Sequence, residues 1–421
     1  MINPVITAII AREEQATIDF RRDLHAHPEL PWEERRTTDR VVAELENIGI
    51  ACRRTAPTGV IADITGSKPG KTVALRADMD ALPVHELNDR LSYKSLTAGK
   101  MHACGHDSHT AMLLTAARAL YEVREQMAGN VRLIFQPAEE IAAARALYEV
   151  REQMAGNVRL IFQPAEEIAE GAKAMIAQGA LDNVDNIFGM HIWSGSPSGK
   201  ISCNVGSSFA SADLLKVTFR GRGGHGSMPE ACIDAAVVAS AFVMNLQAIV
   251  ARETSPLDSA VVSIGRMDVG TRFNVIAENA LLDGTVRCFS IETRRRLEAA
   301  ITRYAQHTAA MYGASVDVDY CYGTLPVINE ERSALLAQST IREAFGDDVL
   351  FSEKPTTGGE DFSFYLQDIP GCFALLGSGN KAKGSDYAHH HGCFNIDEQV
   401  MKTGAGLYAQ YAWRYLHQDR F

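Results

Sequence analysis

Residues 72–80, TVALRADMD, decide the fold of this 421-residue chain. The short apolar run predicts a strand that ends in two carboxylates, Asp78 and Asp80. VRLIF and NIFGMHIW are continuous apolar runs, as expected for strands buried on both faces, and the second contains His191. A helical pattern over residues 109–127 separates the first run from VRLIF. Strands that alternate with helices predict an α/β fold with a mostly parallel sheet.

Residues 101–107, MHACGHD, place a thiol, two imidazoles and a carboxylate within one short segment. Divalent metals of the zinc type bind sulfur and imidazole ligands of this kind. Further ligand-type residues follow in Glu-Glu after Gln-Pro-Ala, in His191, and in the run His389-His390-His391. Ligands bind beyond the carboxyl ends of strands in such sheets. The sequence therefore predicts a metal site assembled there from distant segments.

Composition restricts the class of protein. An apolar content of 46% and a charged content of 22% indicate a large buried core. The net charge of −11 gives no support to nucleic-acid binding. The eight scattered cysteines form no C-x-x-C pair, which predicts reduced thiols in a cytoplasmic protein. No secretory signal and no run of about 18 apolar residues is recognised, so no membrane span is expected.

The texture of the sequence changes near residue 207. DLLKVTFRG and SAVVSIGRMDVG alternate like half-exposed strands, and ACIDAAVVASAFVMNLQAIV lies between them as a long apolar helix. Residues 324–421 return to the α/β texture. We therefore predict a catalytic domain in two pieces, 1–206 and 324–421, with an α+β domain over residues 207–323 inserted between them.

Residues 116–142 are repeated without change as residues 143–169. Solenoid repeats diverge and recur several times, so one tandem copy does not predict a repeat architecture. The duplication leaves two candidate pairs for one site, Glu139-Glu140 and Glu166-Glu167. Without the 27 surplus residues, the remaining 394 form a coherent two-domain chain.

These motifs resemble the M20 family of metallopeptidases and amidohydrolases, in the subgroup of hippurate and indole-acetyl-amino-acid hydrolases. The matching segments, which span nearly the whole chain, are HAHPEL (25–30), ALRADMDALPV (74–84), MHACGHDSHTAMLL (101–114), LIFQPAEE, GMH (189–191), GRGGHGSMP (221–229), GTRFNVI (270–276), GTVR (284–287) and GGEDF (358–362). The resemblance implies a metal-dependent hydrolase of N-acyl-amino acids or similar small amides. It also implies two divalent ions per subunit (Mn, Zn or Co) and a lid domain that forms a homodimer.

The resemblance further implies roles for single residues. The metal ligands would be Cys104, His106, Glu167, His191 and His390. Glu166 would be the general base, and Asp80 and Asp107 would orient ligand imidazoles. The lid would add His225 and Asn274 around the carbonyl oxygen, and Arg287 would hold the substrate carboxylate.

The second glutamate pair is favoured because it leads into IAEGAKAMI, which has the family's glycine turn and helix, whereas the first leads into IAAARAL. Counting back from Phe394 selects His390, but His389 and His391 stay open. A dipeptidase or an N-acetyl-diaminopimelate deacetylase is an alternative function. A protein that binds metal but is catalytically impaired by the duplication is an alternative of another class.

Overall fold

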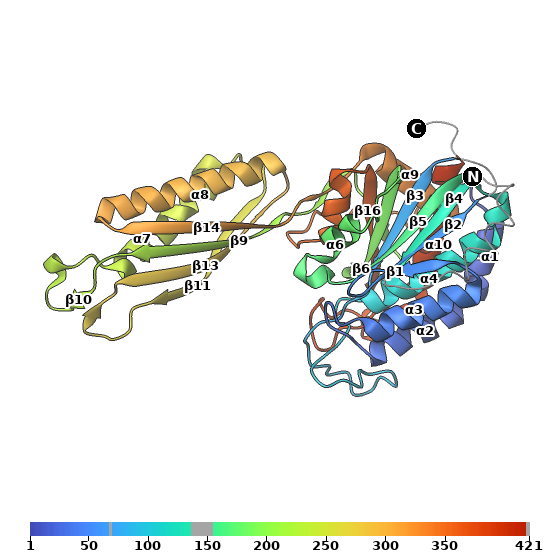
Figure 1. The fold of residues 1–421 in the computed structure, drawn as a ribbon, viewed down its shortest axis with the longest axis horizontal. Helices are drawn as coiled ribbons and strands as arrows, with labels where there is room; N and C mark the ends of the chain where they lie inside the picture. The colour runs from blue at the N-terminus through green and yellow to red at the C-terminus, as the bar shows by residue number, and fades with distance from the viewer. Residues whose placement is uncertain (67–69, 136–154, 418–421) are drawn as a thin grey trace. The chain divides into compact units, whose positions relative to one another are not determined.

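The computed structural model describes residues 1–66, 70–135 and 155–417. These residues form two compact units. Unit 1 comprises Met1–Gly206, Ile328–Lys354 and Phe364–Phe421, and unit 2 comprises Ser207–Val327 and Pro355–Ser363. The predicted class, an α/β fold with an inserted α+β unit, is confirmed (Figure 1).

The sheet of unit 1 is mostly parallel. Its strands follow the order β1-β2-β5-β3-β6-β16-β7, in which β5, β3, β6 and β16 are parallel neighbours. The bounds are β1 (Cys52–Arg54), β2 (Val60–Thr65), β3 (Thr72–Asp78), β5 (Ala155–Gln163), β6 (Asn186–Pro197), β7 (Ile201–Ser202) and β16 (Gly371–Gly379). All seven residues of β3 are buried, as its apolar sequence predicts for a central strand.

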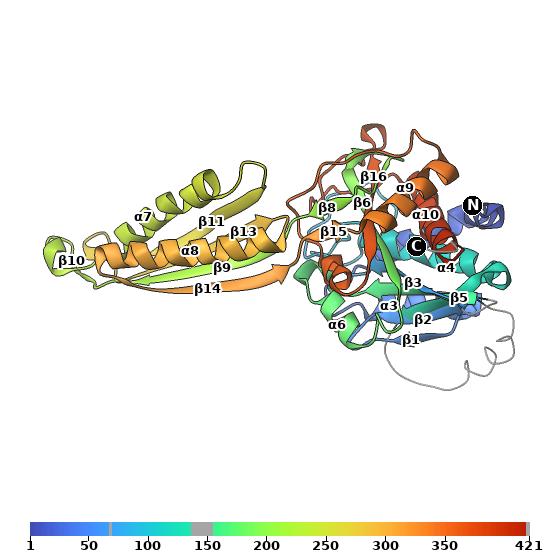
Figure 2. The same ribbon diagram turned by 90° about the horizontal axis from the view of Figure 1, so that it is seen from above.

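Helices cover this sheet. The bounds are α1 (Pro4–Arg12), α2 (Glu14–Ala26), α3 (Arg35–Ile48), α4 (His106–Glu122), α6 (Gly171–Ala177), α9 (Glu331–Phe345) and α10 (Met401–Leu416). Helices α4 and α10 pack on β3 and on each other (Figure 2). Helices α1, α2 and α3 pack against α4 (Figure 1). Pro4 in the first turn and the Asn3 side chain, which accepts from Val5 N, begin α1. Gly49, at φ 91°, ends α3.

The two copies of the duplicated segment meet at one strand. Strand β5, from the second copy, pairs with β2 along one edge and with β3 along the other. Strand β4 (Ala128–Phe135), from the first copy, also pairs with β5, with Asn130 opposite Asn157 and Ile134 opposite Ile161. Since β2 and β3 already use both edges of β5, β4 is not needed to complete the sheet. The first glutamate pair, Glu139-Glu140, lies outside the described residues.

Unit 2 is a four-stranded antiparallel sheet in the order β11-β13-β9-β14. The bounds are β9 (Ala212–Arg220), β11 (Ala260–Val269), β13 (Asn279–Cys288) and β14 (Ser315–Thr324), with α7 (Ala235–Ala248) and α8 (Ile291–Tyr312) packed on it. Alternate residues of β9 and β13 are buried, as expected for strands with one face in a core. Short strands β10 (Gly224–His225) and β12 (Val275–Ile276) pair with each other.

One helix of unit 2 bears on the expectation that the chain has no membrane span. Residues Ala235–Glu253 are long and apolar enough to cross a membrane by length and composition, and 33% of them are buried. Val238, Phe242 and Leu246 of this helix join the core of unit 2, which is the ordinary reason for an apolar helix in a folded domain.

The units differ from the predicted boundaries in residues 324–327, which belong to unit 2, and in one further segment. Residues 355–363 belong to unit 2, although they fall within the predicted second catalytic piece. The backbone explains this grouping, because Ala210 N donates to Thr356 O at 3.0 Å and Thr356 N donates to Ser208 O at 2.9 Å. Long-range strand pairing of this kind leaves no local signal in the sequence.

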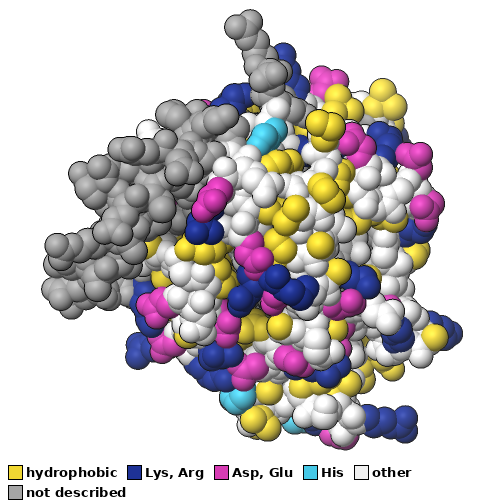
Figure 3. All heavy atoms as spheres, turned by 90° about the vertical axis from the view of Figure 1, so that its right-hand side faces the viewer, with side chains coloured by type: hydrophobic (Ala, Val, Ile, Leu, Met, Phe, Trp, Pro, Cys, Tyr) yellow, Lys and Arg dark blue, Asp and Glu magenta, His cyan; other side chains and the backbone are white. Residues whose placement is uncertain are grey.

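On the face of unit 1 shown in Figure 3, acidic and basic side chains are interspersed among hydrophobic ones.

We expect deletion of residues 129–155 to preserve folding. The deletion leaves one copy of the 27-residue repeat, and β5 keeps both of its neighbours. The melting temperature of the shortened protein, measured by calorimetry, should equal or exceed that of the full chain. A clear fall in melting temperature would show that the first copy stabilises the fold.

Candidate metal centre

The predicted ligands of unit 1 meet beyond the carboxyl ends of the parallel strands. Cys104 and His106 flank Gly105, whose φ of 93° is left-handed and whose Cβ would lie 2.5 Å from Ile192 Cγ2. Glycine therefore lets the backbone approach β6 at this point. His191 lies within β6, which continues beyond its pairing with β3.

The five predicted ligands fall into two overlapping groups. Cys104, His106 and His191 form one group, and Cys104, Glu167 and His390 form the other; within each, the candidate donor atoms lie within 4.8 Å of one another. Cys104 Sγ is 3.4 Å from His191 Nε2. Glu167 Oε1 is 3.8 Å from His106 Nε2 and 3.5 Å from His390 Nε2. The groups share the Cys104 thiol, which is a geometry suited to two neighbouring ions.

The hydrogen-bond pattern fits a metal at this place. Among the described residues, His106 Nε2 and Glu167 Oε1 are buried atoms with no hydrogen-bond partner, a condition that costs about 1–3 kcal/mol for each group. His191 Nδ1 donates to the Ile192 carbonyl, so its Nε2 keeps a lone pair. Sulfur, nitrogen and oxygen donors together suit zinc, cobalt or manganese.

Burial and neighbouring charges shift the pKa values of two of the donors, His191 and Cys104. Burial, and next the neighbouring His109, hold the pKa of His191 well below its usual range, so the ring is the neutral form that binds metals. Burial, reinforced by the charge of Glu167, raises the pKa of the Cys104 thiol well above its usual value. A nearby cation would offset both effects on the thiol.

Asp80 connects two of the predicted ligands. Its Oδ1 lies 3.3 Å from His106 Nδ1, and its Oδ2 accepts from Glu167 N at 3.0 Å. The carboxylate therefore orients the His106 ring and fixes the turn that carries the glutamate pair.

A buried carboxylate that the sequence did not single out supports the same turn. Glu34 Oε1 accepts from Ala165 N at 3.0 Å, and Oε2 accepts from Thr58 Oγ1 at 2.7 Å. Ala165 adopts the left-handed conformation, at φ 54°, and the buried acceptor helps to hold it there. Burial, with the nearby charge of Asp80, raises the pKa of Glu34 to about 7. In the sequence, Glu34 lies in a polar segment that reads as solvent-exposed.

Gly171 explains why the second glutamate pair fits this turn. A Cβ at Gly171 would lie 1.7 Å from Pro164 O, so no other residue fits without a backbone shift. The equivalent position after the first glutamate pair is Ala144. The first pair is therefore not followed by the glycine that the turn requires.

Two neighbouring side chains have roles that differ from the expectation. Asp107 does not orient a predicted ligand: its carboxylate contacts Arg21 Nε and His25 Nδ1, each at 2.8 Å. The sequence also missed His109, which is fully buried, donates to Asp78, and accepts from Ile192 N at 2.8 Å. Both ring nitrogens of His109 are used, so this histidine is a structural support.

The predicted residues of unit 2 lie at two places. His225 pairs with Val275, and Gly226 N donates to Asn274 O at 2.9 Å, so His225 and Asn274 are neighbours. Ser227 N donates to His225 Nδ1 at 3.2 Å, which leaves the ring proton on Nε2. Arg287 lies eight residues beyond Asn279 on β13, roughly 27 Å away at about 3.4 Å per residue.

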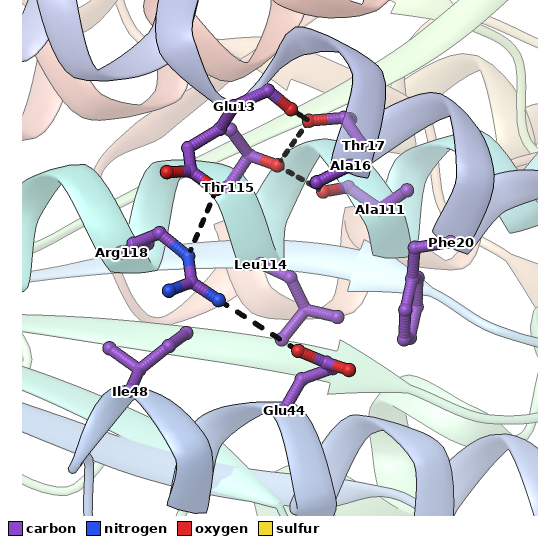
Figure 4. A pocket seen from close by; sticks show the side chains of 10 residues that line it. All are labelled: Glu13, Ala16, Thr17, Phe20, Glu44, Ile48, Ala111, Leu114, Thr115 and Arg118. Carbon is purple, nitrogen blue, oxygen red and sulfur yellow. Dashed lines mark hydrogen bonds and ion pairs between the residues drawn. The ribbon is translucent and has the colours of Figure 1, made fainter.

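A separate small cavity lies between α2, α3 and α4 (Figure 4). Its volume is about 40 Å³, which is room for water rather than substrate. Arg118 spans it, 3.5 Å from Glu13 and 3.8 Å from Glu44, and Thr17 contacts Thr115 beside it. None of the predicted site residues lines this cavity.

The chain belongs to peptidase family M20/M25/M40, whose model matches residues 74–153 and 141–414. The two matches overlap inside the duplicated region. The chain is 38% identical to the IAA-amino acid hydrolase ILR1-like 2 of Arabidopsis thaliana, over 95% of this chain and 85% of that protein. It is 36% identical to the N-acetylcysteine deacetylase of Bacillus subtilis, over 94% and 95%. The predicted family and amidohydrolase subgroup are confirmed.

The fold is also similar to a solved structure. The YXEP protein of Bacillus subtilis, described as a dinuclear metal-binding peptidase of family M20, superimposes with a TM-score of 0.80 at 32% identity. The match covers 96% of this chain and 99% of the YXEP chain.

We expect Gly171→Ala to damage the centre. Forcing the backbone away from Pro164 should cost about 1–3 kcal/mol of stability and move Glu166 and Glu167 out of place. The control is Gly265→Ala on β11, where a Cβ would meet nothing within 4 Å. Bound metal, counted by atomic emission, should fall only in the first variant. Equal metal content and melting temperature in both variants would contradict the role of Gly171.

Proposed function

We propose that the protein hydrolyses the amide bond of N-acyl-amino acids or similar small conjugates, with two divalent ions held by Cys104, His106, Glu167, His191 and His390. The observation that carries this proposal is that two buried atoms beside the Cys104 thiol, His106 Nε2 and Glu167 Oε1, form no hydrogen bond within the described part of the chain. The activities printed for the plant hydrolase and the bacterial deacetylase support the same substrate class.

The residues of unit 1 divide the chemistry. Bound divalent ions would supply a nucleophile at neutral pH by lowering the pKa of water. Glu166 precedes the ligand Glu167. Its carboxylate lies within 4.8 Å of the Glu167 carboxylate and of a ring nitrogen of His106. We assign it to take the proton of the attacking water and return it to the leaving nitrogen. Asp80 contacts both His106 and Glu167 and so holds these two ligands in position for the reaction.

The residues of unit 2 serve the substrate. His225 carries its ring proton on Nε2, the arrangement needed to donate to a carbonyl oxygen, with Asn274 beside it. Arg287 is half-buried, its Nε donates to Thr285 Oγ1 at 2.9 Å, and burial lowers its pKa. Among the described residues it makes no ion pair with a carboxylate, which leaves it suited to bind the carboxylate of a substrate.

The separation along β13 supports a homodimer. His225 pairs with Val275 of β12, just before β13 begins, whereas Arg287 lies near the other end of β13. This separation is greater than the length of a small N-acyl-amino acid. One of them must therefore act on a substrate bound with another copy of the chain. Strand β11 is an edge of the sheet, and α7 exposes Val237 and Met244. Both features suit pairing of unit 2 with its own copy.

We assign the protein to the cytoplasm, with no membrane and no nucleic acid among its partners. All eight cysteines are free thiols, which supports a reducing compartment. The acidic net charge of −11 opposes binding to a polyanion.

One panel of variants tests this function. Release of the amino acid from N-acetyl and aromatic N-acyl substrates should cease after chelation and return with Mn, Zn or Co. Glu166→Gln should keep its metal and lose roughly 10²–10⁴-fold in rate, because a positioned proton-transfer group contributes that much. Glu139→Gln is the matched control from the identical first copy and should stay active.

The other outcomes separate the alternatives. Metal binding without turnover of any substrate would support the catalytically impaired protein. Preferred cleavage of dipeptides or of N-acetyl-diaminopimelate would support the alternative enzymes. If Glu139→Gln is inactive and Glu166→Gln is active, the site contains the first glutamate pair, Glu139-Glu140, instead of the second.

Mixed dimers test the role of His225. His225→Ala and Glu166→Gln should each be inactive, whereas exchange of their subunits should restore about a quarter of native activity. One site in each mixed dimer is then intact, and half of the dimers are mixed. Proven subunit exchange without activity would show that His225 acts within its own chain or has no catalytic role.

A further inference from the structure

His389 lies beside the metal centre without belonging to either ligand group. Its Nδ1 is 3.7 Å from Cys104 Sγ, within hydrogen-bonding distance for sulfur. The ring packs against Trp193, with centroids 4.8 Å apart, and against Phe394, at 4.9 Å. These contacts hold the imidazole in one orientation toward the thiol.

The other ring nitrogen fixes where the proton lies. Ser194 N donates to His389 Nε2 at 3.2 Å. A nitrogen that accepts a hydrogen bond carries no proton, so the proton of the neutral ring is on Nδ1. The protonated nitrogen is therefore the one that lies 3.7 Å from Cys104 Sγ.

His390 shows the opposite arrangement. Its Nε2 lies 3.5 Å from Glu167 Oε1, and it belongs to the group of Cys104 and Glu167. Its φ of 65° is left-handed, and its N donates to Ala103 O at 2.8 Å. Because of this backbone turn, the two adjacent histidines contact different residues of the centre: His389 contacts Cys104 and His390 contacts Glu167.

We propose that His389 donates a hydrogen bond from Nδ1 to the Cys104 sulfur and thereby tunes this thiolate as a metal ligand; the inference rests on the proposed metal function. His389 is a positioning residue, because it acts through Cys104. A hydrogen bond to a thiolate withdraws charge from sulfur and weakens its donation to a metal.

The cobalt-substituted protein tests the inference by spectroscopy. A thiolate bound to Co(II) gives a sulfur-to-metal charge-transfer band, whose energy falls when sulfur becomes a stronger donor. His389→Phe keeps the stacking on Trp193 but removes the donor, so its band should shift to longer wavelength. His389→Asn places an amide N–H near the position of Nδ1, so its band should remain close to the native one.

A third variant keeps the contact with Ser194 and removes only the donor at Nδ1. His389→Gln places an amide nearer the position of Nε2 and keeps the Ser194 contact, so it should shift the band as His389→Phe does. Bands of all variants at the native wavelength would overturn the inference. Loss of one bound cobalt per subunit in every variant would also overturn it, because His389 would then be a ligand.

The same spectra separate this inference from the proposed function. The native band should vanish in Cys104→Ser. If the native protein has no such band, or if the band survives in Cys104→Ser, the proposed ligand set fails and the tuning role fails with it. A Cys104-dependent band that His389 does not shift refutes the tuning role alone.

Discussion

The geometry of the centre depends on one carboxylate. Asp80 lies two residues beyond the end of β3 and contacts the His106 ring with one oxygen and the Glu167 backbone with the other. His106 begins α4, and Glu167 follows β5, so these ligands come from different parts of the chain. Because one rigid carboxylate joins them, their spacing is fixed by the alignment of β3 with β5. The distance between these two ligands therefore depends on the pairing of β3 with β5.

Buried polar contacts determine this alignment. Asp78 lies opposite Gln163 in the parallel ladder, and Arg76 bonds both side chains, to Gln163 Oε1 at 3.0 Å and to Asp78 Oδ2 at 2.8 Å. A shift of β5 by one residue would turn Gln163 to the opposite face, away from Arg76. The first copy contains the same strand sequence, so the ladder alone cannot select between the copies. The selection comes from Gly171, and Glu170 adds a contact with Trp32 Nε1 at 3.4 Å.

The sequence predicted what local patterns encode. Apolar runs predicted the strands that form the parallel sheet, and the alternating pattern predicted the inserted unit. The role of Glu34 was not predictable, because its contact joins residues 131 positions apart. Asp107 was misassigned for a geometric reason. Adjacent residues of a helix point about 100° apart, so Asp107 faces Arg21 and His25 on α2 when His106 faces the centre.

Hydrogen-bond accounting distinguishes histidines that the sequence cannot. His106 and His191 each have one ring nitrogen in contact with a protein acceptor and the other directed at the centre. Both ring nitrogens of His109 form hydrogen bonds within the protein, one with Asp78 and one with Ile192 N. His389 accepts a backbone N–H on one nitrogen and so presents a proton, rather than a lone pair, to Cys104. A neutral imidazole has one donor and one acceptor. The partner of its far nitrogen therefore decides whether the near one can bind a metal or can only support a ligand.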